Sequence, residues 1–81
     1  MIKTWSDISR IETAINAIAE ASGAVARVGS IVDLDDVDTG EALGEVMSKN
    51  DTALRALRAW VDKARTAREA ADLERKKAGL L

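Results

Sequence analysis

The sequence predicts an all-α fold in which a helix, an acidic loop and a longer helix form an antiparallel hairpin. The 81-residue chain contains no proline, its apolar residues recur at intervals of three and four, and alanine is abundant. These features favour amphipathic helices. We expect a single domain over residues 1–81, with helices at about 6–28 and 39–77 and the acidic loop at 30–38.

The first helix follows two residues that suit an N-cap, Thr4 and Ser6. Its apolar residues lie on one face and form a seam typical of helices that pack in pairs. The seam consists of Ile8, Ile11, Ile15, Ile18, Ser22 and Val25. Gly29 is the expected end of this helix, because glycine is common just past the last helical turn.

The connection and the residues after it are strongly acidic. In the loop we expect Ile31, Leu34 and Val37 to tuck against the helices. The acidic residues do not follow the spacing of a calcium-binding loop, so we expect no metal ion and no cofactor. One interpretation is a solvated loop followed by a helix N-terminus, which favours negative charge, and the functional interpretation is a surface for a basic protein partner. The candidate residues are Asp33, Asp35, Asp36, Asp38, Glu41 and Glu45.

The second helix is expected to start with a capping-box pair, Asp38 and Glu41. Its apolar seam contains Leu43, Val46, Met47, Leu54, Leu57, Trp60, Val61 and Ala64. Residues 48–51 leave two alternatives open. The helix breaks or kinks there, because Ser48 and Asn50 suit N-caps, or it continues with Asn50 on the seam, where a buried Asn would fix helix register. The seam deteriorates after Ala64, so the last dozen residues should project from the core.

The two helices differ in length, at roughly 33 Å and 60 Å, so a hairpin leaves part of the long helix uncovered. A small chain without disulfides or metals also has little core of its own. We therefore expect a homodimer that forms a four-helix bundle, with a three-helix bundle as the alternative. The candidate core and self-association residues are Ile11, Ile15, Ile18, Leu54, Leu57, Trp60 and Val61.

The composition excludes several kinds of chemistry. Without His or Cys, the chain has no cysteine nucleophile, histidine base, zinc finger or disulfide. Acidic residues interrupt the basic C-terminal half, and Tyr, Phe and His are absent, which disfavours direct nucleic-acid binding. No apolar stretch is long enough to span a membrane. We expect a cytoplasmic protein that does not contact membranes and is not an enzyme.

These features favour a protein that acts by binding another macromolecule. One form of this function is a small phage- or prophage-type inhibitor, of the anti-CRISPR kind, which occludes a basic nucleic-acid-binding groove with its acidic segment. No motif links the chain to a particular family. The alternatives are a structural or assembly protein that self-associates through its helices and a small nucleic-acid-binding regulator. Trp5 is a candidate exposed contact residue, because tryptophan is common in binding hot spots.

Overall fold

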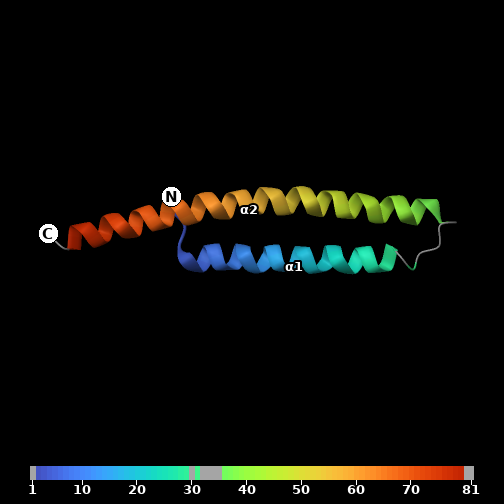
Figure 1. Cartoon of the computed structure of the whole chain (residues 1–81), viewed down its shortest axis with the longest axis horizontal. Helices are drawn as coiled ribbons and strands as arrows, with labels where there is room; N and C mark the ends of the chain where they lie inside the picture. The colour runs from blue at the N-terminus through green and yellow to red at the C-terminus, as the bar shows by residue number, and fades with distance from the viewer. Residues whose placement is uncertain (1, 30, 32–35, 80–81) are drawn as a thin grey trace.

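The computed structural model describes residues 2–29, 31 and 36–79, and all regular structure within them is helical. Helix α1 (Trp5–Gly29) is followed by helix α2 (Val37–Gly79). The two helices pack side by side in opposite directions (Figure 1). The prediction of an all-α helical hairpin is therefore confirmed, and each helix extends one or two residues beyond its expected bounds.

Helix α1 begins where Thr4 and Asp7 cap each other. The N–H of Asp7 donates to Thr4 Oγ1 at 3.1 Å, and the N–H of Thr4 donates to Asp7 Oδ2 at 3.4 Å. Such a pair satisfies backbone donors that have no partner inside the helix. The hydrogen bonds with Thr4 also hold the pKa of Asp7 below its usual range. Of the two predicted N-caps, Thr4 fills this role and Ser6 lies inside the helix.

Helix α2 begins two residues earlier than expected because Asp36 is its N-cap. Asp36 Oδ1 accepts a hydrogen bond from the N–H of Thr39 at 3.1 Å, and the hydrogen bonds of Asp36 with the side chain and the backbone of Thr39 lower its pKa. An N-cap side chain reaches the backbone N–H groups two or three residues further on. Since Asp38 already lies within the helix, the prediction of a capping box between Asp38 and Glu41 is wrong.

Helix α2 continues without interruption through residues 48–51, so the three-helix alternative is wrong. Asn50 stays on the seam, where its Nδ2 donates to Ser22 Oγ of α1 at 3.1 Å in a half-buried position. A shift of the helices by one turn would separate these two polar groups and leave both without a partner in an apolar seam. The Asn50–Ser22 bond therefore favours one register of the hairpin.

The core between the helices is small. Among the described residues, four apolar side chains are buried, namely Ile8, Ile15, Leu54 and Val61. Partly buried side chains pack against them, namely Ile11, Ile18, Leu57, Trp60 and Ala64. All seven residues that the sequence analysis assigned to the core or to self-association lie in this cluster, and Ile8 joins them as its most deeply buried member.

The apolar residues beside the connection do not tuck against the helices as predicted. Ile31 is 81% exposed and Val37 is 62% exposed, while Leu34 lies outside the described residues. At this end of the hairpin the two helices already use their apolar faces to contact each other. The prediction is therefore wrong for Ile31 and Val37, because each lies at a helix end: the N–H of Ile31 donates to Val28 O at 2.9 Å, and Val37 is the first residue of α2.

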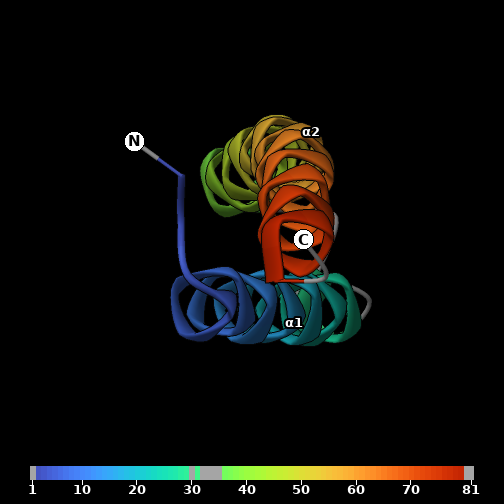
Figure 2. The same cartoon turned by 90° about the vertical axis from the view of Figure 1, so that its left-hand side faces the viewer.

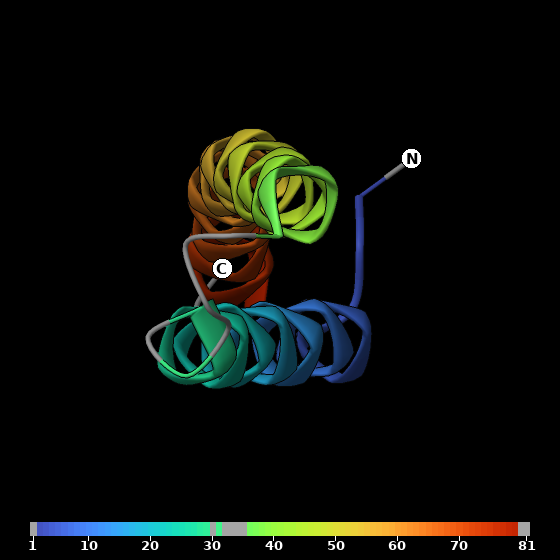
Figure 3. The same ribbon diagram turned by 90° about the vertical axis from the view of Figure 1, so that its right-hand side faces the viewer.

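The hairpin is a rod with dimensions of 70 × 15 × 13 Å. Its radius of gyration is 19.1 Å, against about 12 Å for a compact chain of this length. The last turns of α2 extend past the start of α1, as predicted (Figure 1). Views from the two ends show residues 2–4 rising along one side of α2 (Figures 2 and 3).

Candidate functional site

One side of the hairpin, which we call the polar flank, is closed by charged residues. Arg65 Nη2 donates to Glu12 Oε1 across the two helices at 2.9 Å. The same side carries Asn16, Arg58 and Asp62 around a small hollow. A half-exposed ion pair of this kind contributes only about 0.2–1 kcal/mol to stability. Its main significance is that charged side chains occupy the edge of the core on this side.

The opposite side, which we call the apolar flank, has a different chemistry. In an antiparallel hairpin, residues three positions after the buried ones lie on the same side of both helices. The positions that apply here are three residues after Ile8, Ile15 and Ser22 of the seam on α1, and three residues after the buried Leu54 and Val61 on α2. With Trp60 beside them, the apolar flank consists of Ile11, Ile18, Val25, Leu57, Trp60 and Ala64, all of them partly buried.

The structure divides the predicted acidic surface. Asp33 and Asp35 lie outside the described residues, and Asp36 caps α2. The remaining three residues, Asp38, Glu41 and Glu45, are exposed and line a shallow hollow. Their spacing of three and four residues places them on the side of α2 that faces away from α1. We call these three residues the acidic stripe.

Trp5 joins the start of α1 to the C-terminal half of α2. Its indole Nε1–H donates to Asp72 Oδ2 at 2.9 Å, while Asp72 Oδ1 accepts a bond from Arg68 Nε at 3.0 Å. The bond with Arg68, followed by the bond with Trp5, lowers the pKa of Asp72. Trp5 remains 43% exposed. The predicted contact residue is therefore part of the intramolecular packing and also presents part of its ring at the surface.

The sequence carries no signal that pairs Trp5 with Asp72, since 67 positions separate them. The contact depends on how far the two helices slide past each other. The polar pair in the seam, Asn50 and Ser22, favours that register. Once this register is given, the helical rise of about 1.5 Å per residue brings the beginning of α1 level with the region around Asp72.

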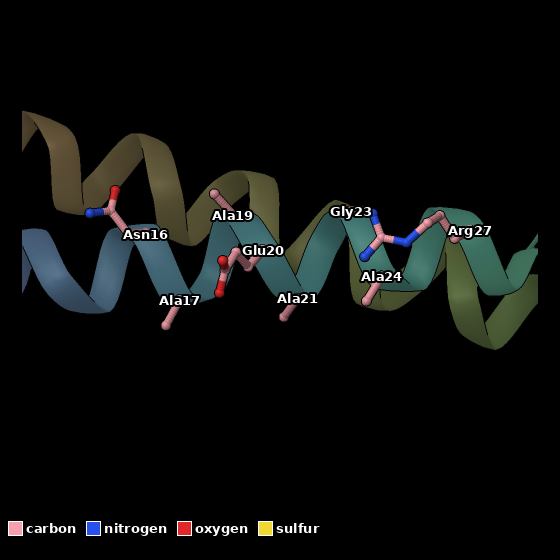
Figure 4. Close-up of a pocket in the computed structure, with 8 residues that line it drawn as sticks. All are labelled: Asn16, Ala17, Ala19, Glu20, Ala21, Gly23, Ala24 and Arg27. Carbon is pink, nitrogen blue, oxygen red and sulfur yellow. The ribbon is translucent and has the colours of Figure 1, made fainter.

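The outer face of α1 carries a shallow depression lined by small side chains (Figure 4). Ala17, Ala21 and Ala24 point away from α2, and Glu20 and Arg27 lie beside them. All of the lining residues belong to this single helix. The depression lacks a second wall that could enclose a ligand, so it is an ordinary helix surface with small side chains.

Within residues 2–29, 31 and 36–79, no three acidic side chains lie close enough together to hold a metal ion. In the same part of the chain, neither helix combines the length and apolar character needed to cross a membrane. Comparison with protein-family models, curated proteins and solved structures finds no match to this chain. The surfaces that its geometry offers to a partner are the acidic stripe, the apolar flank and the exposed part of Trp5.

Proposed function

We propose that the chain is a non-enzymatic protein-binding module that acts by docking onto another macromolecule. Its large exposed surface supports this function. The accessible surface is 6319 Å² for a chain of 8.7 kDa, whereas a compact monomer of this mass exposes about 4,700 Å². The difference, about 1,600 Å², equals the total area that a protein–protein interface of standard size buries.

The acidic stripe favours a basic protein surface as the partner. Asp38, Glu41 and Glu45 form a row on a continuous helix, and all three are exposed on the side of α2 that faces away from α1. Exposed charges in such a row attract a partner of opposite charge and raise the rate of association. A nucleic-acid-binding groove carries the required positive charge. By occupying it, the chain would compete with nucleic acid in the manner of a small phage-type inhibitor.

Charge reversal tests this function. The variant with Asp38→Lys, Glu41→Lys and Glu45→Lys should lose partners that the wild-type chain retains from a bacterial lysate. A matched control reverses three exposed acidic residues elsewhere, Glu20, Asp51 and Glu69, and changes the net charge equally. The amount of partner protein that the wild-type chain retains should fall as the salt concentration rises, because exposed charges are screened beyond about 8 Å at physiological ionic strength.

Mass spectrometry identifies the retained proteins, and circular dichroism checks that each variant keeps its helices. A partner specific to the acidic stripe binds the wild type and the control variant, and added nucleic acid releases it. Retention that is equal for the wild type and the stripe variant at low and high salt would contradict the proposal. In that case the contact would have to lie on the apolar flank or Trp5.

Assembly through helical self-association is a second candidate function. The apolar flank favours it, because partly exposed apolar side chains from both helices lie together on one side of the rod. Two hairpins that meet through this side would form a dimeric four-helix bundle. The acidic stripe lies on the far side of α2 and would stay accessible, so the two candidate functions are compatible.

A further inference from the structure

We propose that a second copy of the chain covers the apolar flank, lying antiparallel to the first copy. This inference rests on the second candidate function and is independent of whether the acidic stripe binds a foreign protein. It identifies the contact surface, the orientation of the two copies and the residues that determine both.

The amount of exposed surface is sufficient for this partner. A standard interface buries about 800 Å² on each side, and the rod exposes about twice that area in excess of a compact monomer. The apolar flank extends from Ile11 to Val25 along α1, about 21 Å. On α2 it is continued by Val46, which is 43% exposed. Residues Ile2 and Lys3 lie beside Trp60, Ala64 and Ala67 and cover part of its C-terminal portion on α2.

The position of the apolar flank along the rod favours two-fold symmetry. The contacts of Asn50 with Ser22 and of Arg65 with Glu12 place Ile18 level with the region of Leu57. This point is the middle of the apolar flank and also lies near the middle of α2. A two-fold axis there brings the same patch of both copies together and overlaps the two long helices along their whole length. The turns of α2 that α1 leaves uncovered then lie beside the partner copy.

The distribution of charge favours an antiparallel arrangement. Around the start of α2 the described chain carries Asp36, Asp38, Glu41 and Glu45, whereas Arg75, Lys76 and Lys77 lie near its end. An antiparallel pair places the acidic end of each copy near the basic end of the other. A parallel pair would place like charges together, which is unfavourable. In the antiparallel arrangement, the charges of one copy therefore complement those of the other copy.

Ala53 tests the contact surface because a long charged side chain there would block it. Ala53 is half-buried. It lies seven residues, or about two helical turns, before Trp60, so the two side chains are on the same face of α2. Ala53→Arg should raise the dissociation constant of the dimer by about 30-fold or more, since it buries an unpaired charge on each side of the interface. Ala59→Arg is the matched control because it makes the same substitution outside the contact surface. The side chain of Ala59 is exposed and faces away from α1.

Sedimentation equilibrium over a range of concentrations measures the assembly. The inference predicts twice the chain mass for the wild type and for Ala59→Arg, and the monomer mass for Ala53→Arg at the same concentration. Circular dichroism reports whether the helices persist. A monomeric, fully helical wild type, or an Ala53→Arg variant that dimerises as tightly as Ala59→Arg, would overturn the inference.

A spin label tests the orientation without disturbing the contact surface. The chain has no cysteine, so Gly44→Cys provides a single attachment site near the acidic end, where no atom lies within 4 Å of the added Cβ. Gly44 lies on the side of α2 opposite the apolar flank. With the axis near Leu57, the two labels in an antiparallel dimer are about 39 Å apart along the rod, whereas in a parallel dimer they are level with each other along the rod and closer together. Pulsed electron paramagnetic resonance distinguishes these distances. The short distance, or no dipolar coupling at a concentration where the mass is dimeric, refutes the antiparallel arrangement.

Discussion

Truncation of Ile8 should cost more stability than the same truncation one turn further along α1. Ile8 has 0% of its surface exposed, and replacing such a residue with alanine costs about 2–5 kcal/mol through lost burial and the cavity left behind. Ile8 lies near the open end of the rod, where its neighbours have room to relax, so we expect about 3 kcal/mol. A chain of this size has a total stability of about 4–12 kcal/mol.

The rod buries about half of the surface that its unfolded chain exposes, which places its stability near the lower end of that range. Ile8→Ala should therefore bring the protein close to its unfolding midpoint without denaturant. Ile11→Ala is the matched control, because Ile11 is partly buried on the apolar flank. In the isolated hairpin its truncation should cost about half as much as that of Ile8.

Urea denaturation followed by far-ultraviolet circular dichroism measures both losses. At protein concentrations where only monomer is present, Ile8→Ala should shift the midpoint furthest. At higher concentration the cost of Ile11→Ala should grow, because a second copy would then bury the apolar flank. A loss below about 1 kcal/mol for Ile8→Ala, with an unchanged denaturant slope, would refute the assignment of Ile8 as the most deeply buried residue of the core.

Three other predictions concern single features of the hairpin. A double-mutant cycle of Asn50→Ala and Ser22→Ala should give a coupling energy of about 1 kcal/mol, the net value of one half-buried hydrogen bond; additive effects in urea denaturation would show that the bond contributes nothing. Gly44→Ala should raise the free energy of unfolding by about 0.5–1 kcal/mol, because no atom lies within 4 Å of the added Cβ and alanine favours the helix. A melting temperature that stays the same or falls would contradict this. Asp72 has a pKa below its ordinary value of 3.8, so its ionised form stabilises the fold above that pH, and the stabilisation is lost as pH falls through the lower folded pKa. The melting temperature should be level near neutrality and drop below about pH 4, and Asp72→Asn should make this drop shallower.

The helices could be predicted because their signals are local. The spacing of Ile8, Ile15, Leu54 and Val61 identifies the seam, and Gly29, the expected stop of the first helix, is the last residue of α1. The N-cap of α2 was harder to predict, because several nearby aspartates have the same chemistry and the path of the backbone decides which of them becomes the cap. Local sequence patterns do not determine that path.

The candidate surfaces could be predicted only in part. Periodicity placed Ile8 and Ile11 on the same seam, yet one is fully buried and the other lies on the apolar flank. The difference arises from how far each helix rotates about its own axis when the two pack together. Trp60 shows the same effect, since it was predicted to lie in the seam and is instead partly buried on the apolar flank. Side-chain periodicity alone has no information on this rotation.

The spacing of contacts along the rod also determines how the hairpin closes and opens. Sequence separation rises from 28 for Asn50–Ser22 to 53 for Arg65–Glu12 and 67 for Trp5–Asp72. The entropy of loop closure differs by less than about 1 kcal/mol over this range, but each contact is easiest to form once the preceding one has aligned the helices. Closure therefore proceeds like a zipper from the connection toward Trp5, and the buried core from Ile15 to Ile8 on α1 forms in its later steps.

This order has a direct spectroscopic consequence. Trp5 contacts Asp72 at the end of the hairpin that closes last, and Trp60 packs against the buried core. Local opening is easiest where few apolar side chains are buried, and the described parts of both helices beside the connection bury none. On gentle heating, the helical circular dichroism signal should consequently begin to fall before tryptophan fluorescence changes, and amide hydrogens near Ser22 should exchange faster than those near Ile8.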